Sequence, residues 1–332
     1  MSRHLLLLDG STAAEEAIPH AVEAARTFRA KLLLLHVLAA ESASPQGAVD
    51  SVAWRMRRAE AGAYLKAWQT RLEEQDLEVE TEVREGRPDE QILDVVRSRA
   101  IDLLVFAPRG AGAGTTLGLG DTAQKIVSSG AVSFLLVRAP LAPHPTKAGA
   151  PRYRRVLVPL DASRRAECAI QVAAAIARAH DAPLCLEHVA PVPELPGAMP
   201  PTVEDVELRD RVVARNRQRG SAYLEEVRGR VAGGDLDVTT KVLVAPDVGR
   251  AVCRSVRDEQ VDLVVASAHG GGCRGTGAFP PYGTVARELI TDGVASVWVL
   301  QDLPTVAGAD ASPASGPQFS SPVRETETVT PS

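Results

Sequence analysis

Aromatic side chains, cysteines and long apolar runs are all scarce in this sequence. Aromatic residues make up 4% of the 332 residues, and apolar runs such as residues 5–8 and 32–35 are short. A helix that crosses a bilayer needs about 20 apolar residues, so the sequence predicts no membrane-spanning helix. The four cysteines have no CxxC spacing. We expect them to be reduced thiols, with Cys168, Cys185 and Cys253 packed in or near a core and Cys273 in an exposed loop.

The sequence also has no large excess of charge of either sign. Its formal net charge is -5, and the lysines and arginines are scattered instead of forming a basic block. A nucleic-acid partner held by a basic face is therefore not expected. The N-terminal residues pass directly into a short leucine run without the features of a secretory signal, so we expect a cytoplasmic protein without a membrane partner.

An internal repeat is the most informative feature that is present. Residues 7–11 read LLDGS and residues 159–163 read PLDAS, which places Asp161 152 positions after Asp9. The AYL sequence at 63–65 recurs at 222–224, and the DLLV sequence at 102–105 recurs as DLVV at 262–265. The offset between matching segments grows only by a few residues along the chain. The sequence therefore consists of one ancestral unit that was duplicated.

Each unit shows strands that alternate with helices. Short apolar runs predict strands in the first unit near 4–9, 31–37, 77–84, 102–107 and 133–138. Their counterparts lie near 155–160, 183–189, 236–243, 261–267 and 295–301. Helical patterns cover 13–29, 48–75 and 89–99, and Thr12 with Glu15 has the spacing of a capping box at the first helix. The alternation predicts a doubly wound α/β fold with a parallel sheet in each unit.

The repeat and the local composition together predict the domain boundaries. We expect a first domain at 1–140, a linker rich in proline and alanine at 141–151, a second domain at 152–302 and a disordered tail at 303–332.

Two aspartates mark the expected carboxyl end of the first strand in each unit. Asp9 and Asp161 stand where a parallel sheet places its ligands, and a carboxylate there can accept hydrogen bonds from ribose hydroxyls. The alternative is that each aspartate, with Ser11 or Ser163, caps the helix that follows. Their recurrence in both units supports a functional role, but the two alternatives stay open.

A glycine-rich loop follows the expected fourth strand of each unit. It covers 109–121 in the first unit and 269–284 in the second. Glycines expose backbone N–H groups to phosphate oxygens, and the next helix adds the positive end of its dipole. Neither loop contains the GK[ST] ending of a P-loop or a GxGxxG sequence, so a flexible connection without a ligand is the alternative.

These features together resemble the universal stress protein family over both units. Its nucleotide-binding members have an Asp after the first strand, a Val after the second, and a G-x2-G-x9-G-[ST] loop after the fourth. The second unit aligns Asp161, Val189, Ser267, Gly270, Gly283 and Thr284 with this pattern, and the first unit aligns Asp9, Val37, Ala107, Gly110, Gly120 and Asp121. Ser267 in the second unit and Ala107 in the first replace the first loop glycine.

The departures from the family pattern differ between the two units. Asp121 replaces the phosphate-contacting hydroxyl in the first unit, and a carboxylate there would repel a triphosphate unless a metal intervened. The second unit keeps Thr284, although twelve residues instead of nine separate Gly270 from Gly283. We therefore expect the better nucleotide site in the second unit.

The resemblance implies two flavodoxin-like domains with strand order 3-2-1-4-5, whose fifth strands pair antiparallel so that one chain forms an internal pseudo-dimer. It implies a stress-response regulator that binds ATP, with Mg²⁺ as an accompanying ion, or a related adenine nucleotide. Further homodimerisation and protein partners stay open. The alternative is an interaction module of the same fold that binds no nucleotide. We find no catalytic or metal-binding residue pattern, and any ATP hydrolysis would be slow. His36 and His188 are expected to pack or to make local hydrogen bonds.

Overall fold

The computed structural model of the chain describes most of both repeat units. The described residues are 2–39, 51–108, 118–138, 153–194, 200, 202–233, 235–271 and 281–301. The expected linker at 141–151 and the expected tail at 303–332 lie outside them, as do Gly110 and Cys273. Within the described residues, no helix is both long enough and apolar enough to cross a membrane.

The two units contain matching sets of strands and helices. The first unit has β1 (Arg3–Leu7), α1 (Thr12–Glu15), α2 (Ile18–Phe28), β2 (Lys31–Leu38), α3 (Ser51–Glu73), β3 (Val79–Glu85), α4 (Pro88–Ser98), β4 (Leu103–Phe106), α5 (Asp121–Ser129) and β5 (Ser133–Leu136). The second has β6 (Val156–Pro159), α6 (Arg164–His180), β7 (Leu184–Pro191), α7 (Val203–Val231), β8 (Val238–Ala245), α8 (Val248–Asp258), β9 (Leu263–Ser267), α9 (Thr284–Asp292) and β10 (Ser296–Leu300).

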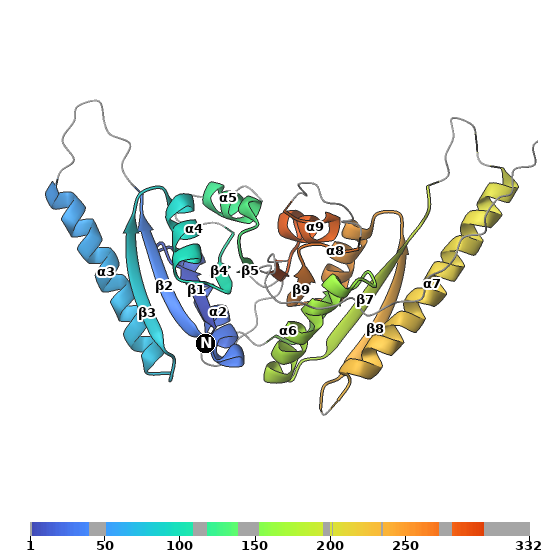
Figure 1. Cartoon of the computed structure of the whole chain (residues 1–332), viewed down its shortest axis with the longest axis horizontal. Helices are drawn as coiled ribbons and strands as arrows, with labels where there is room; N and C mark the ends of the chain where they lie inside the picture. Colours follow the sequence, from blue (N-terminus) through green and yellow to red (C-terminus); the bar gives the residue numbers. More distant parts are fainter. Residues whose placement is uncertain are drawn as a thin grey trace, which may run out of the picture.

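The described strands form one ten-stranded sheet, in the order β3-β2-β1-β4-β5-β10-β9-β6-β7-β8. Each half is parallel and has the predicted order 3-2-1-4-5. Helices α2, α3, α6 and α7 pack on one face of the sheet and α4, α5, α8 and α9 on the other (Figure 1). The predicted doubly wound α/β architecture is therefore confirmed in both units.

Burial explains why the central strands have almost no polar residues. Every side chain of β4 and of β5 is buried, because helices cover both faces of the sheet at its centre. The outer strand β3 has only one fully buried residue, Val79, and carries charged residues along the rest of its length. Charges on an outer strand discourage pairing with other chains.

The start of the first helix differs from the sequence prediction. The N-cap is Ser11, whose hydroxyl accepts a hydrogen bond from Ala14 N at 3.1 Å, and the predicted capping box based on Thr12 is wrong. Thr12 is the first helical residue, and the helix is interrupted after Glu15 before α2 begins. Ser163 caps α6 in the same way, with Ala166 N at 3.2 Å, so the repeat preserves the serine cap.

Aspartates at the amino ends of β4 and β9 join neighbouring strands in both units. Asp102 Oδ2 accepts a hydrogen bond from Arg3 N at 2.9 Å, and Asp262 Oδ2 accepts from Arg154 N at 2.7 Å and Arg155 N at 3.1 Å. These bonds hold the start of the first strand beside the start of the fourth. The aspartate that begins the repeated DLLV and DLVV sequences thus has a structural role, because it lies at the amino ends of the strands, away from their carboxyl ends.

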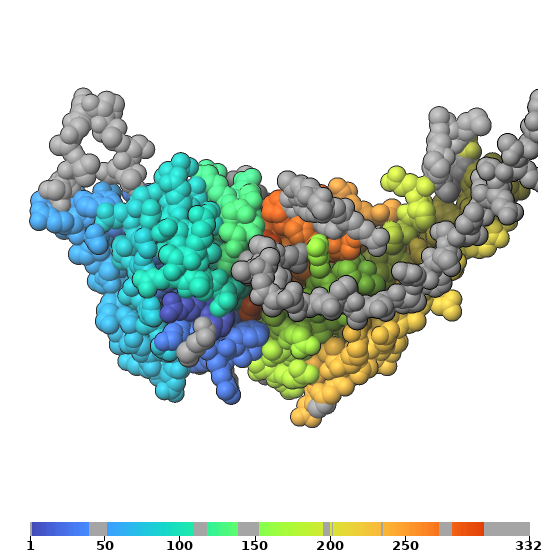
Figure 2. Space-filling model, viewed as in Figure 1, coloured from blue at the N-terminus to red at the C-terminus, as the bar shows by residue number. Residues whose placement is uncertain are grey.

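The two units meet where β5 and β10 pair antiparallel, with Leu135 opposite Trp298. This pairing is the predicted internal pseudo-dimer, and Figure 2 shows the halves in direct contact through the middle of the molecule. Tyr282 reaches across this interface and donates a hydrogen bond to Val127 O at 2.7 Å. On the other face, the Tyr153 hydroxyl lies 2.6 Å from His20 Nδ1 of α2.

Arg138 stabilises the interface by binding the carboxyl end of a helix from the other unit. Its guanidinium donates to Leu289 O at 3.1 Å, to Ala295 O at 3.2 Å and also to Ile290 O. The last carbonyls of a helix lack partners within the helix and carry partial negative charge, so a cation placed there is favourable.

We expect Arg138→Ala to lower the free energy of unfolding by about 2–4 kcal/mol, because α9 then loses charge-assisted hydrogen bonds at its end. Chemical denaturation measures this effect. The control is Arg257→Ala, which removes an exposed arginine from the last turn of α8 and is expected to change stability by less than about 0.5 kcal/mol. Equal effects of the two substitutions would contradict the role given to Arg138.

Candidate functional site

A cavity of about 460 Å³ lies at the carboxyl ends of β6, β7 and β9. Helices α8 and α9 supply its remaining walls, through residues such as Val252 and Ala286. The strand that follows β6 in the sequence, β7, pairs with β6 on one side, whereas β9 pairs with β6 on the other side. This change in winding direction is where open parallel sheets form ligand sites.

All six residues predicted for the site of the second unit line this one cavity: Asp161, Val189, Ser267, Gly270, Gly283 and Thr284. They come from three strand ends and the start of α9, and the fold brings them together although 123 positions separate Asp161 from Thr284 in the sequence. Their convergence agrees with the prediction about position. Their role in binding stays a prediction.

The first unit has a related cavity of about 640 Å³ at the carboxyl ends of its own strands. Asp9, Val37 and Gly120 line it, together with Ala107 and Asp121, whereas Gly110 lies outside the described residues. Asp121 is the first residue of α5 and Thr284 is the first residue of α9. At this same place in the fold, the cavity of the first unit therefore has a carboxylate and the cavity of the second unit has a hydroxyl.

Asp161 is held in position by hydrogen bonds from two loops. Its Oδ1 accepts from Ser163 N at 3.0 Å and its Oδ2 accepts from Gly271 N at 2.7 Å. Asp9 Oδ1 similarly accepts from Ser11 N at 3.0 Å and from Ser11 Oγ at 2.6 Å. The helix caps are the serine hydroxyls and not the aspartates. The aspartates instead bind backbone N–H groups of the neighbouring loops, and their carboxylates lie at the cavities.

Gly270 allows this close approach of Asp161. A Cβ atom built on Gly270 would lie 2.0 Å from Asp161 Oδ2, a distance that no real contact of this kind shows. Gly283 is different, because a Cβ there would have Ala268 O as its nearest neighbour at 3.6 Å, an ordinary contact distance. Of these two loop glycines, only Gly270 is required by the space around it.

The hydroxyls of Ser267 and Thr284 have different surroundings. Ser267 Oγ donates a hydrogen bond to His269 O at 2.7 Å, so its hydroxyl proton is engaged within the loop. Thr284 stands at the start of α9, and Gly283 before it donates its N–H to Ala268 O at 2.8 Å. The backbone of Gly283 thus ties the start of α9 to the end of β9 and directs the helix N-terminus toward the cavity.

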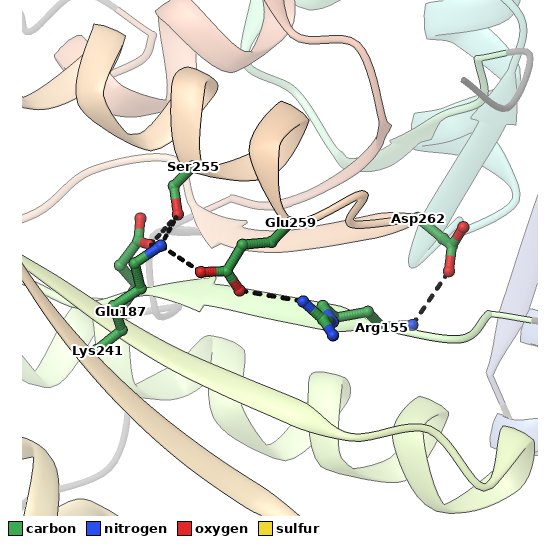
Figure 3. Close-up of polar contacts among 6 residues, drawn as sticks. All are labelled: Arg155, Glu187, Lys241, Ser255, Glu259 and Asp262. Carbon is green, nitrogen blue, oxygen red and sulfur yellow. Dashed lines mark hydrogen bonds and ion pairs between the residues drawn. The ribbon is translucent and has the colours of Figure 1, made fainter. Parts of the chain in front are cut away.

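Sequence reasoning did not single out Glu187, a charged residue among those that line the cavity. This β7 residue is 1% exposed, and its Oε2 accepts a hydrogen bond from Ser255 Oγ of α8 (Figure 3). Lys241 Nζ of β8 lies 3.9 Å from the same oxygen and pairs with Glu259, which Arg155 contacts at 3.2 Å. Burial raises the pKa of the Glu187 carboxyl to about 7, although Ser255 and Lys241 act in the opposite direction.

Among the described residues of the first unit, no carboxylate is buried in this way. Leu35 pairs with Leu7 at the register where Glu187 pairs with Pro159, so Leu35 is the counterpart of Glu187. Leu35 pairs with Glu82 of β3, and Glu82 forms an ion pair with Arg99 at 3.1 Å. The second unit has Lys241 and Glu259 at these two positions, so the ion pair is kept but its charges are exchanged. An alignment of the two repeats contains this signal, because Glu187 follows the apolar residues 184–186 and stands where the first unit has a leucine.

The predicted roles of the histidine and cysteine residues have mixed outcomes. His188 Nδ1 lies 2.7 Å from Leu160 O and its ring packs against Gly220 of α7, which agrees with the predicted local hydrogen bond and packing. Cys185 is buried, but the core position predicted for Cys168 is wrong, because Cys168 lies off the apolar face of α6 and is exposed. Within the described residues, no three His, Cys, Asp or Glu side chains gather as metal ligands would.

The comparisons with known proteins agree on one family. A family model described as the universal stress protein family matches residues 1–138 and 152–301. A curated universal stress protein of Methanocaldococcus jannaschii is 26% identical over 137 residues, which are 40% of this chain and 79% of that protein.

Two solved structures match almost the whole length of the chain. A universal stress protein from Archaeoglobus fulgidus matches with 15% identity and a TM-score of 0.58, over 90% of this chain and 96% of that one. A functionally unknown protein from Pseudomonas aeruginosa matches with 15% identity and a TM-score of 0.61, over 90% and 92% of the two chains. At this identity the two structures show the shared fold alone.

We expect Gly270→Ala to destabilise the protein by about 1–3 kcal/mol, because the new Cβ displaces the Asp161 carboxylate from its loop contacts. Gly283→Ala is the matched control and is expected to cost less than about 1 kcal/mol, the ordinary range for a surface position. The double variant Gly270→Ala, Asp161→Ala should lose less stability than the two single effects added together. Strict additivity in chemical denaturation would contradict the contact.

The buried carboxyl of Glu187 also predicts a pH-dependent stability difference. Its pKa is about 7 in the folded protein and is ordinarily 4.5, so the folded state holds the proton more tightly. The stabilisation by this proton is complete below pH 4.5 and is lost as the pH rises through 7. The variant Glu187→Leu, Ser255→Val, which copies Leu35 and Val95 of the first unit, lacks this dependence.

We therefore expect the unfolding free energy of this double variant, relative to that of the natural protein, to rise by about 2–3 kcal/mol between pH 5 and pH 8. Chemical denaturation at both pH values measures it. Glu226→Gln, which changes an exposed residue of α7, should show no such rise. A pH-independent difference for the double variant would show that Glu187 keeps an ordinary affinity for its proton.

Proposed function

The chain belongs to the universal stress protein family, since the two family matches cover most of it, and from this premise we propose that it binds ATP or a related adenine nucleotide. The main site would be the cavity of the second unit, and the bound nucleotide would control a stress response through conformation or partner binding. The observation that carries the proposal is the convergence of Asp161, Val189, Gly270, Gly283 and Thr284 on that one cavity.

The backbone of Val189 is suited to contact the edge of a base. Glu187 O accepts a hydrogen bond from Leu160 N at 2.7 Å, so the N–H and C=O of Glu187 point toward β6. Backbone groups alternate sides along a strand, and those of Val189, two residues later, therefore point the same way. Because β6 ends at Pro159, no strand of the described part of the chain faces Val189 on that side.

The remaining parts of a nucleotide follow from the order of the strands. Asp161 lies two residues after the end of β6, the middle strand of the second unit, where its carboxylate would accept hydrogen bonds from the ribose. The start of α9 lies beyond β9 and would bind phosphates through the Thr284 hydroxyl, the loop backbone and the helix dipole. Mg²⁺ would bind mainly to the phosphates, because no three-residue metal cluster lies within the described part of the chain.

Regulation is a better explanation of this cavity than catalysis. Its two carboxylates, Asp161 and Glu187, come from β6 and β7 and not from the α9 side where the phosphates would lie. Each is already oriented by hydrogen bonds from the protein. We propose that any hydrolysis of bound ATP is slow, since neither carboxylate stands where it could activate a water beside the terminal phosphate.

Asp121 favours a different role for the first unit. At the start of α5 it places negative charge where a triphosphate would have to lie, which repels the nucleotide. We propose that the first unit serves mainly as an interaction module and pairs with the second through β5 and β10.

A reciprocal exchange of two residues tests the proposal. The natural protein should bind ATP with Mg²⁺ saturably in a calorimetric titration, and Thr284→Asp should weaken this binding by on the order of tenfold or more through charge repulsion. Asp121→Thr should add a second, weaker site in the first unit. Adenosine, which lacks phosphates, is the control ligand, and its affinity should change less than about threefold in either variant.

The proposal fails if the natural protein shows no saturable binding at millimolar ATP, and the interaction module then becomes the function of both units. If Thr284→Asp leaves ATP binding unchanged while Asp9→Ala abolishes it, nucleotide binding stands but its assignment to the second unit is wrong.

A further inference from the structure

Tyr282 connects the cavity of the second unit to the first unit. It lines that cavity two residues before Thr284, and its side chain is buried. Its hydroxyl donates a hydrogen bond to Val127 O of α5 at 2.7 Å. Burial raises the pKa of this hydroxyl above its ordinary value of 10.0, so the phenol keeps its proton and remains a donor. A buried hydrogen bond therefore joins the residues before α9 to the last part of α5.

The end of α5 also packs against the residue before Tyr282. Gly130 forms the carboxyl-terminal cap of α5 with a φ of +60°, and a Cβ atom built on it would lie 3.3 Å from Pro281 Cβ. That distance is shorter than most contacts of a real Cβ atom, so the two segments lie closely against each other. A displacement of residues 281–282 therefore either moves the end of α5 or breaks its contacts.

Two routes of packed residues run from this contact to the cavity of the first unit. The first is α5 itself, because residues 121–123 at its other end line that cavity. The second is a row of three aromatic rings. Tyr282 packs edge-on against Phe134 of β5 with ring centroids 5.9 Å apart, and Phe134 lies 5.7 Å from Phe106, which lines the first cavity. Contiguous packing of this kind carries energetic coupling between two sites when one of them moves.

The two units use different donors at the equivalent contact. Val127 of α5 and Ile290 of α9 occupy matching positions, and these helices lie on the same face of the sheet on either side of the β5–β10 pair (Figure 1). Tyr282 donates to Val127 O, whereas Arg138 donates to Ile290 O. Arg138 is not among the described residues that line the first cavity, and Leu119, the counterpart of Tyr282, has no hydroxyl. The hydrogen bond from the second cavity therefore has no equivalent at Leu119.

We propose that Tyr282 transmits the state of the second cavity to the first unit: a ligand that fixes the start of α9 also restrains α5 and the wall of the first cavity. This inference rests on the proposed nucleotide binding and adds the route by which a bound nucleotide changes the other unit. Tyr282 is a positioning residue, because it acts through α5 and β5. The coupling is reciprocal, so a change at the end of α5 also alters the start of α9.

Amide hydrogen exchange of the full chain, measured with and without ATP and Mg²⁺, tests the proposal. In the natural protein, saturating ATP should slow exchange at least about threefold both at 284–288 in α9 and at 121–130 in α5. Tyr282→Phe removes only the hydroxyl and should preserve the effect on α9 while reducing that on α5. Tyr282→Leu, which copies Leu119, also removes the ring contact and should abolish the effect on α5.

Two control variants distinguish coupling from other causes. Tyr223→Phe removes a tyrosine hydroxyl that donates to Glu167 within the second unit, and it should leave both effects unchanged. Thr284→Asp, which weakens binding to the second cavity, should abolish both effects at the ATP concentration that just saturates the natural protein. An effect on α5 that survives Thr284→Asp would come from nucleotide in the first cavity and would contradict the inference.

A second measurement needs no ligand. Gly130→Ala places a methyl group against Pro281 and should speed exchange at 284–288, in the other unit, by at least about threefold relative to α2, which reports the change in global stability. Gly229→Ala is the control, because a Cβ atom on this α7 glycine has no neighbour within 4 Å among the described residues. It should leave exchange in both segments unchanged. Thermal denaturation verifies that each variant is folded.

The outcomes separate this inference from the proposed function. If ATP slows exchange in α9 but not in α5 of the natural protein, or if Tyr282→Leu keeps the full effect on α5, nucleotide binding stands and the coupling through Tyr282 is wrong. If ATP changes neither segment and shows no saturable binding, nucleotide binding is wrong. The Gly130→Ala measurement then decides the inference, since unchanged exchange at the start of α9 would refute the coupling.

Discussion

The antiparallel pairing of β5 with β10 is the interaction on which the rest of the molecule depends. Both strands are apolar, and each would be an exposed edge if its unit stood alone. Pairing buries Phe134, Leu135, Val297 and Trp298 and turns two parallel sheets into one. The same interface reaches the cavity of the second unit, because Tyr282 lines that cavity and donates its hydroxyl proton to Val127 O of the first unit.

The two units have kept the same frame and diverged at their cavities. Both retain the serine cap after the first strand, the aspartate before the fourth, and a tyrosine that donates to a helix glutamate, Tyr64 to Glu15 and Tyr223 to Glu167, each at 3.0 Å. These contacts position the strands and helices, so any change in them would cost stability in either unit. The differences lie among the residues that line the cavities, where the first unit has Leu35 and Asp121 and the second has Glu187 and Thr284.

Much of the architecture could be predicted because it depends on local patterns. Apolar runs and their alternation with helical segments placed every described strand within about three residues, a normal uncertainty for element ends. The N-cap was placed one residue late, because Ser11 and Thr12 are both good caps and only the backbone conformation selects between them. Cys168 was misplaced because the orientation of one helical residue depends on which face of α6 meets the sheet.

The duplication and the residues at the carboxyl ends of the strands could be read from the sequence alone, since they follow from order and periodicity along the chain, whereas the strand order was implied by the family resemblance. Only the tertiary structure decided that Gly270 must lack a Cβ because Asp161 lies against it, and that Arg138 binds the end of α9. The packing of β7 against α8 also buries the carboxylate of Glu187 beside Ser255. The physical reason is that burial, hydrogen-bond partners and local electrostatics arise between residues far apart in sequence, and they exist only once β7, β8 and α8 have packed together.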